Sequence, residues 1–164
     1  MIRKSVLMLF AVALFACVGF AQDHPNFSGT WKLNLSKSNP GDYGPSARTD
    51  QITQAGSKFT DKVVSTTQMG DANYTLEFTA DGNKVTVPAG SPRSSMGALT
   101  LLNISAAWDG PALVVNTNST YQSQMDVASK VTYTLSADGK TPTMASHVSL
   151  QMGDFDTSLV FDKQ

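Results

Sequence analysis

The sequence predicts an all-β protein, an antiparallel up-and-down barrel of about 8–10 strands. Apolar and polar residues alternate with period two through most of the chain, Asp-Gly pairs separate several of the alternating runs, and no stretch after Ala21 has a sustained helical period. Consecutive hairpins with one polar face form an antiparallel meander, and closure into a barrel hides its edge strands. A sandwich of two sheets would produce the same periodicity and is the alternative.

The first 21 residues have the layout of a secretory signal peptide. Arg3 and Lys4 precede an uncharged apolar run over residues 5–20, and Gly19 and Ala21 are the small residues expected before a cleavage site. We therefore predict that residues 1–21 are cleaved, that residues 22–164 form one barrel domain, and that the protein is secreted or periplasmic without a transmembrane segment after cleavage. An uncleaved membrane anchor is the alternative, although the apolar run is short for a span of about 20 residues.

The only cysteine, Cys17, lies within this apolar run. Cleavage after Ala21 would remove it, so the mature chain would have no disulfide and its core would have to supply the stability. The preceding residues, Leu14-Phe15-Ala16, loosely resemble a bacterial lipoprotein box, which makes a lipid anchor on Cys17 a second possibility. Phe15 is bulky for that motif, and the simpler interpretation is a cysteine that serves as apolar filler.

The alternation is clearest near the start of the mature chain. Apolar residues and one glycine take the odd positions over residues 27–35, namely Phe27, Gly29, Trp31, Leu33 and Leu35, while polar residues take the even positions. Similar patterns cover residues 74–79, 127–135, 144–152 and 155–161. Shorter apolar runs near residues 52, 63–64, 85–87, 99–104 and 113–115 bring the expected total to about ten strands.

Hairpin turns are expected where Asp-Gly occurs between two such runs, at residues 81–82, 109–110 and 138–139, because this pair tolerates the positive φ angles of tight turns. The tetrapeptide Gln-Met-Gly-Asp occurs at residues 68–71 and 151–154 and predicts two similar turns. Residues 38–49 and 88–97 contain several prolines and glycines and are expected to be loops. The two arginines of the mature chain, Arg48 and Arg93, fall in these predicted loops.

The segment Asn-Phe-Ser-Gly-Thr-Trp-Lys-Leu at residues 26–33 resembles the first strand of the lipocalin and fatty-acid-binding-protein superfamily, which opens with Phe-x-Gly-x-Trp. The resemblance implies that Trp31 plugs the closed end of a barrel and that Gly29 lets the backbone pack tightly. Together with the Trp-Asp-Gly at residues 108–110 and the short ending at residues 160–164, it also resembles secreted lipocalin-like proteins of environmental bacteria, notably acidobacteria, most of which have no assigned activity.

One departure from that superfamily concerns the ligand. Its fatty-acid binders close with an Arg-x-Tyr motif whose cation holds the ligand carboxylate, whereas the last strand here reads Ser-Leu-Val-Phe-Asp at residues 158–162. With Arg48 and Arg93 both placed in loops, carboxylate capture inside the barrel is not carried over to this chain.

Charge and residue types argue against several functions. Without Arg3 and Lys4, ten cations face thirteen carboxylates, so no basic patch is available for nucleic acid. His24 lies in a tail beside the cleavage site, and His147 has the outward parity, so no metal, cofactor or catalytic residue is expected.

Most carboxylates lie in turns. Asp61 instead shares the parity of inward-facing apolar neighbours and is a candidate buried carboxylate, unless a bulge reverses the strand.

Alternation places seven residues on the inner wall, where a small hydrophobic ligand would contact them: Tyr74, Phe78, Leu102, Tyr133, Met144, Met152 and Phe161. The first hypothesis is an exported lipocalin-like protein that binds a small apolar or amphipathic molecule. The second is a non-catalytic structural or interaction protein of the bacterial envelope whose barrel is packed solid. An enzyme on the same fold ranks last, because no acid–base or nucleophile set is visible. The sequence identifies no protein partner.

Overall fold

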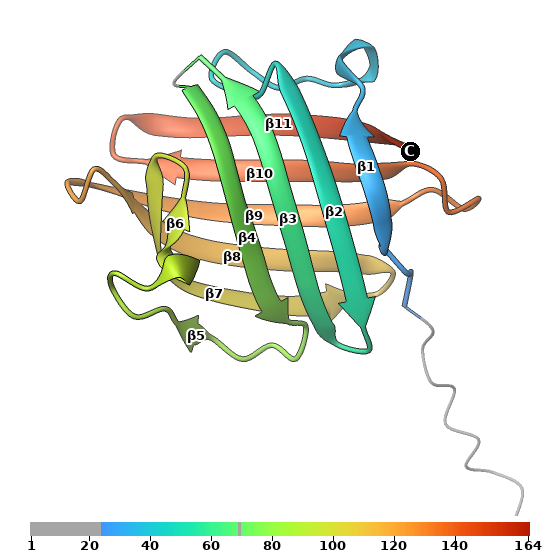
Figure 1. The fold of residues 1–164 in the computed structure, drawn as a ribbon, viewed down its shortest axis with the longest axis horizontal. Helices are drawn as coiled ribbons and strands as arrows, with labels where there is room; N and C mark the ends of the chain where they lie inside the picture. The colour runs from blue at the N-terminus through green and yellow to red at the C-terminus, as the bar shows by residue number, and fades with distance from the viewer. Residues whose placement is uncertain (1–23, 69) are drawn as a thin grey trace, which may run out of the picture.

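The structure, a computed structural model, describes residues 24–68 and 70–164; the predicted signal peptide, Cys17 and Met69 lie outside the described residues. The prediction of an all-β antiparallel fold is confirmed (Figure 1). The strands are β1 (Gly29–Leu33), β2 (Ala47–Ala55), β3 (Lys58–Thr67), β4 (Gly70–Thr79), β5 (Val85–Thr86), β6 (Ser95–Met96), β7 (Leu99–Asp109), β8 (Ala112–Tyr121), β9 (Met125–Leu135), β10 (Pro142–Leu150) and β11 (Gly153–Lys163), with 3-10 turns η1 (Leu35–Lys37) and η2 (Pro92–Ser94).

All strands belong to one sheet that curls on itself. The order is β4-β3-β2-β1-β11-β10-β9-β8-β7-β5, and β6 pairs with β7. Strand β1 connects the N-terminal strands of the sheet to the C-terminal ones, because Trp31 pairs with Asp50 of β2 on one side and with Lys163 of β11 on the other. Figure 1 shows β1–β4 as a front layer that crosses β7–β11 behind it at a steep angle. The continuous sheet favours the barrel over the sandwich of two separate sheets.

The sheet does not close by a hydrogen-bonded ladder between β4 and β7. We call this side of the barrel the seam. In the described residues, a bridge between Ala80 and Ala106 and a hydrogen bond from the Gly82 amide to the Ala106 carbonyl at 2.8 Å join the chain just after β4 to β7. Residues 85–97, which we call the strap, cover the rest (Figure 1). A Cβ on Gly97 would lie 2.8 Å from the Cβ of Ala72, so the turn after β6 packs closely on β4. Isolated backbone bonds and side-chain contacts, such as the Arg93–Glu77 ion pair at 3.3 Å between the strap and β4, therefore hold the seam in place of a ladder.

The seam also explains one wrong turn prediction. Two of the Asp-Gly sites connect paired strands, β7 with β8 and β9 with β10. At the third site, residues 81–82, β4 leads into β5, which pairs with β7 instead of β4. The Asp-Gly pair permits the chain to turn there, but the turn carries it across the seam.

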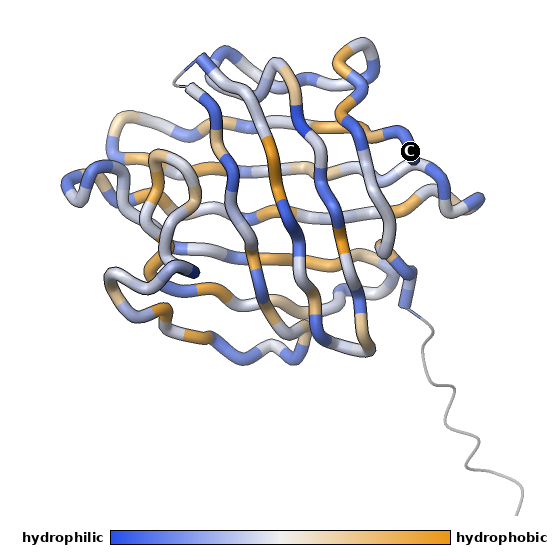
Figure 2. Tube along the Cα trace, viewed as in Figure 1, coloured by the Kyte–Doolittle hydropathy of each residue, from blue (hydrophilic) through white to orange (hydrophobic). Residues whose placement is uncertain are grey.

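The hydropathy pattern produces one continuous core. Figure 2 shows apolar and polar residues alternating along the strands, and the apolar ones fill the interior, with Trp31 and Phe161 at 1% and 0% exposure. The indole Nε1 of Trp31 donates a hydrogen bond to the carbonyl of Phe27 at 2.8 Å, and a Cβ on Gly29 would lie 3.2 Å from the indole ring. Glycine at φ +153° thus leaves room for the tryptophan.

Two boundaries differ from the prediction. The first alternating run ends at Leu33, because the Asn34 side chain accepts a hydrogen bond from the Lys37 backbone and starts a 3-10 turn that leaves Leu35 47% exposed. The predicted loop over residues 38–49 ends early, since β2 already begins at Ala47. Within the described ranges, no helix is long and apolar enough to cross a membrane.

Candidate functional site

The inner face of β2 carries a buried ion pair. Arg48 and Asp50 are two residues apart and therefore point to the same side of the strand. The guanidinium donates from Nε to Asp50 Oδ1 at 2.7 Å and from Nη2 to Oδ2 at 2.9 Å. Asp50 is fully buried and the Arg48 side chain is 17% exposed. The placement of Arg48 in a loop was therefore wrong, because the strand starts before it; Arg93 does lie in the 3-10 turn of the strap.

The pair holds its charge in the interior. Burial, the largest single effect, would lower the pKa of Arg48, but the charge and hydrogen bonds of Asp50, together with Tyr74 and Tyr133, outweigh it and raise the pKa well above its ordinary value. The guanidinium carbon also lies 5.9 Å from the centroid of the Phe161 ring. Arg48 is thus a permanent cation whose best donors are already engaged by Asp50.

A second carboxylate, Asp61, lies on the neighbouring strand β3. It pairs in register with Ile52 of β2 and with Leu76 of β4. Ile52 lies two residues beyond Asp50 on β2, so the two carboxylates are on adjacent strands and close in register. Its exposure is 3%, which confirms the inward parity, and neither of its oxygens has a hydrogen-bond partner within the described residues. Burial, followed by the Asp50 charge, raises the pKa of Asp61 to about 7, and Arg48 offsets only part of this rise.

Two tyrosines accompany these charges. Tyr74 opposes Val63 in the β3–β4 ladder, and Tyr133 of β9 reaches in from the rear layer. Burial raises the pKa of both phenols, and Arg48 opposes that rise at each. Both therefore remain neutral hydroxyls at physiological pH, able to donate or accept a hydrogen bond.

Aromatic rings cluster beside Asp61, toward the hairpin of β2 and β3. The Phe59 and Phe78 rings are stacked with centroids 5.1 Å apart, and Phe27 meets Tyr133 edge-on at 6.2 Å. Trp108 borders this cluster and carries His24 stacked on its ring at 4.1 Å. His24, which the sequence placed in a tail, is therefore packed against the barrel.

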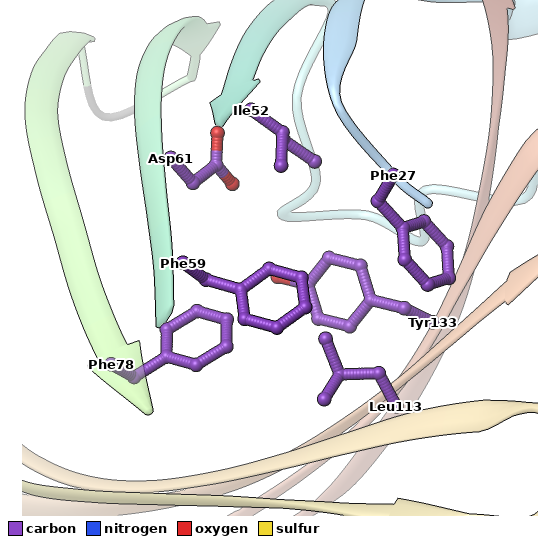
Figure 3. Close-up of a pocket in the computed structure, with 7 residues that line it drawn as sticks. All are labelled: Phe27, Ile52, Phe59, Asp61, Phe78, Leu113 and Tyr133. Atoms are coloured by element: carbon purple, nitrogen blue, oxygen red, sulfur yellow. The ribbon is translucent and has the colours of Figure 1, made fainter. Parts of the chain in front are cut away.

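These groups enclose a small cavity next to Asp61 (Figure 3). Its lining consists of six apolar or aromatic side chains and one carboxylate: Phe27, Ile52, Phe59, Asp61, Phe78, Leu113 and Tyr133. The cavity measures about 10 Å³, which is room for roughly one water molecule. The interior therefore has the chemistry of a binding site, but in this conformation it is nearly filled.

The structure places the seven predicted inner-wall residues unequally. Phe78 and Tyr133 line the cavity, and Tyr74, Met144 and Phe161 also belong to the inner face. Met152 was misplaced: it lies in the β10–β11 turn with 76% exposure, because the strand ends at Leu150. Leu102 was also misplaced, since a bulge in β7 turns its neighbours Leu101 and Ile104 inward instead.

The sequence reasoning missed several residues of the site. Arg48, Asp50 and Ile52 alternate on β2 in the inward parity, a signal that the surrounding prolines and glycines obscured. Phe59 is one of the apolar neighbours whose parity placed Asp61 inside, but it was not itself expected at the site. Phe27 was assigned to the first strand, although it lies just before β1 and turns into the cavity.

A different set of polar groups meets on the outer face of β10 and β11. His147 Nδ1 lies 2.8 Å from Asp156 Oδ1, and its Nε2 lies 3.4 Å from Ser149 Oγ. This is the order of a Ser-His-Asp triad, which the sequence did not predict. The side chains of His147 and Asp156 are 49% and 82% exposed, and the backbone of these strands is paired in ladders. His147 and Ser149 border a depression of about 200 Å³ over β8–β10, but it is open to solvent. Because the strand backbone here is paired, the described residues offer no free backbone donors for the oxyanion site that acyl transfer requires.

No metal centre is evident in the described part of the chain, where no three His, Cys, Asp or Glu side chains cluster as metal ligands. This leaves the enclosed group of Arg48, Asp50 and Asp61 with its aromatic surroundings as the candidate site.

Comparison with known proteins agrees with this geometry at the level of the fold. No family model and no curated protein matches the sequence. The structure is similar to zebrafish ileal bile acid-binding protein complexed with cholic acid, with a TM-score of 0.53 and 13% identity over 84% of this chain and 98% of that one. It is also similar to Caenorhabditis elegans lipid binding protein 8 in its apo form, with a TM-score of 0.49 and 14% identity over 84% and 95% of the two chains. The first likeness supports the predicted lipocalin-like barrel.

Proposed function

We propose that this chain is an exported, non-catalytic lipocalin-like protein that binds a small amphipathic molecule inside its barrel. The observation that carries the proposal is the burial of Arg48, Asp50 and Asp61 in an aromatic interior. A buried ion pair adds little net stability, and an unpaired buried carboxylate destabilises the fold. Perturbed charges of this kind concentrate at functional sites. A protein of similar fold, the zebrafish bile acid-binding protein complexed with cholic acid, is consistent with this role.

Ligand entry would require the interior to widen, because the cavity of about 10 Å³ holds no more than a water molecule. The seam is the part of the wall that opens with the smallest loss of hydrogen bonds. Among the described residues, the backbone links between the end of β4 and β7 are the Ala80–Ala106 bridge and the hydrogen bond from the Gly82 amide to the Ala106 carbonyl, whereas the ladder between β3 and β4 runs over ten residue pairs. Movement of the strap away from β4 would open the interior without separating any long ladder.

Export is the second part of the proposal. It rests on the charged start, the apolar run and the small residues at Gly19 and Ala21. Anchoring through Cys17 is the alternative form of export. Mass spectrometry of the exported protein distinguishes them: a chain that begins at Gln22 supports cleavage, and a lipid-modified cysteine at the N-terminus supports the anchor.

Native mass spectrometry of the exported protein, followed by denaturation and extraction, tests the binding function. We expect a small apolar or amphipathic molecule to co-purify and to leave on unfolding. The neutral probe N-phenyl-1-naphthylamine provides an independent titration, in which Phe78→Ala should change the affinity because its ring lines the cavity. Val64→Ala is the matched control, since Val64 lies on the outer face of the neighbouring strand with 55% exposure.

The entry route has its own test. The variant Ala80→Cys/Ala106→Cys places a thiol on each side of the single bridge of the seam. If ligand enters there, the oxidised protein should bind the probe much more slowly than the same protein after reduction. Equal rates in both forms would contradict the seam as the entry route while leaving the binding function intact.

The nearly filled interior favours one other function, a structural or interaction protein of the envelope that uses its outer surface. A clean apo mass, together with no binding of the neutral probe to the folded protein, would support this second candidate and overturn the first.

A further inference from the structure

The charges of the interior do not balance. Arg48 contributes one positive charge, whereas Asp50 and Asp61 contribute up to two negative charges. Arg48 gives both of its aligned donors to Asp50 at 2.7 and 2.9 Å. Asp61 is left 97% buried with neither oxygen bonded by the described protein groups. A buried carboxylate in this state requires either a proton or a cation from outside the chain.

We propose that the interior site selects a protonated amine whose ammonium group donates hydrogen bonds to Asp61 and whose slender apolar body lies among the aromatic side chains. This inference rests on the proposed ligand-binding function and specifies its ligand class. An ammonium would balance the interior charge and supply the donors that Asp61 lacks. A charge-assisted hydrogen bond of this type is stronger than a neutral one.

The rings around Asp61 fit the same cation. Phe27, Phe59, Phe78 and Tyr133 line the cavity that the carboxylate borders, as Figure 3 shows. Aromatic faces attract ammonium groups through their quadrupole, and the attraction is larger where water is excluded. A carboxylate within an aromatic enclosure therefore recognises an amine better than either element does alone.

A carboxylate ligand fits less well. It would bring a third negative charge beside Asp50 and Asp61, and the cation that would hold it is already bonded on two of its nitrogens. A neutral alcohol could donate one hydrogen bond to Asp61 but would leave the charge unbalanced. The geometry therefore ranks an amine above an alcohol, and an alcohol above a carboxylate.

Binding should also depend on pH. The groups that face Asp61 electrostatically are Asp50, Arg48, Tyr74 and Tyr133. The arginine and the two neutral phenols do not titrate between pH 5.5 and 8. Since burial and the Asp50 charge raise the pKa of Asp61 to about 7, an amine must displace its proton below that pH. Amine affinity should therefore rise from pH 5.5 to pH 8.

Three probes with one apolar body test the inference by isothermal titration of the exported protein: 2-naphthylmethylamine, 2-naphthylmethanol and 2-naphthoate. At pH 8 we expect the amine to bind about tenfold more tightly than the alcohol, with the carboxylate weakest. Asp61→Asn should weaken amine binding about tenfold and leave alcohol binding within about twofold. Asp156→Asn is the matched control, because Asp156 lies on the outer face with 82% exposure.

The outcomes separate the two proposals. Binding of none of the three probes would overturn the ligand-binding function itself. Tightest binding of 2-naphthoate, or amine binding that Asp61→Asn leaves unchanged, would overturn the amine selectivity while the binding function stands. If Asp61→Asn does not fold, the wild-type protein still decides: amine affinity that does not rise between pH 5.5 and pH 8 contradicts the inference.

Discussion

The two layers of this barrel present very different inner faces. The front layer directs Arg48, Asp50 and Asp61 into the interior from β2 and β3. The inner face of the rear layer, β7–β11, is built largely from apolar side chains: Leu101, Ile104, Ala106, Leu113, Val115, Met144, Leu159 and Phe161. Asp50 and Asp61, at 0% and 3% exposure, are as buried as these apolar side chains, so exposure to solvent does not account for the difference.

This contrast separates stability from function. Apolar side chains in the rear layer stabilise the fold by about 25 cal/mol for each Å² of surface removed from water. The charges of the front layer offset part of that gain, because the hydration of each ion is lost. A barrel under selection for stability alone would have two apolar faces. The predictions below test whether the two faces differ in this way.

The largest effect is expected from breaking the ion pair. Arg48→Met leaves Asp50 buried without its partner and should lower the free energy of unfolding by about 4 kcal/mol in urea titrations. The double variant Arg48→Met/Asp50→Leu removes both charges and should return to within about 1 kcal/mol of the wild type. A double variant as unstable as the single one would show that the pair itself stabilises the front layer.

A truncation in the rear layer should lower the free energy of unfolding somewhat less than Arg48→Met does, and by a different mechanism. Ile104 is 2% exposed and does not line the cavity beside Asp61, so Ile104→Ala should lower the free energy of unfolding by about 3 kcal/mol through lost burial and the cavity that remains. The loss should be the same at pH 5 and pH 8, because no titrating group lines the space that the truncation opens. A loss that depends on pH would mean that the two faces are coupled.

Asp61→Asn should instead raise the free energy of unfolding, and only at higher pH. The pKa of about 7 in the folded state lies above the ordinary carboxyl value, so the folded protein binds the proton more tightly than the unfolded chain. The free energy of unfolding of the wild type should therefore fall as pH rises from about 4 to about 7, and level off above that. Asp61→Asn should remove most of this slope and be more stable than the wild type by roughly 2 kcal/mol at pH 8. Equal slopes in both proteins would contradict the buried, unpaired carboxylate.

The smallest effect concerns the strand that joins the two layers. Gly29→Ala places a methyl group 3.2 Å from the Trp31 indole at a positive φ angle. We expect a loss of about 1 kcal/mol and a shift in tryptophan fluorescence. Thr30→Ala, one residue further along the same strand, is the control that should leave the fluorescence unchanged.

The candidate site could be predicted in part. The parity of Asp61 was enough to place it inside, because β3 is regular from Lys58 to Thr67. Arg48 was missed, because prolines and glycines just before it led the whole stretch to be interpreted as a loop. Leu102 was misplaced by a bulge, and Met152 by a strand that ends two residues before it. Alternation identifies a face only as long as the strand is unbroken.

The sequence by itself determined the fold class, the course of most strands and the fully buried Trp31, because period two and turn residues are local signals. Only the tertiary structure decided that β5 crosses the seam to pair with β7, and that Arg48, Asp50 and Asp61 share one interior with four aromatic rings. Those arrangements depend on which strands become neighbours and on where the sheet curls. Both are set by the packing of the whole chain, which no local pattern records.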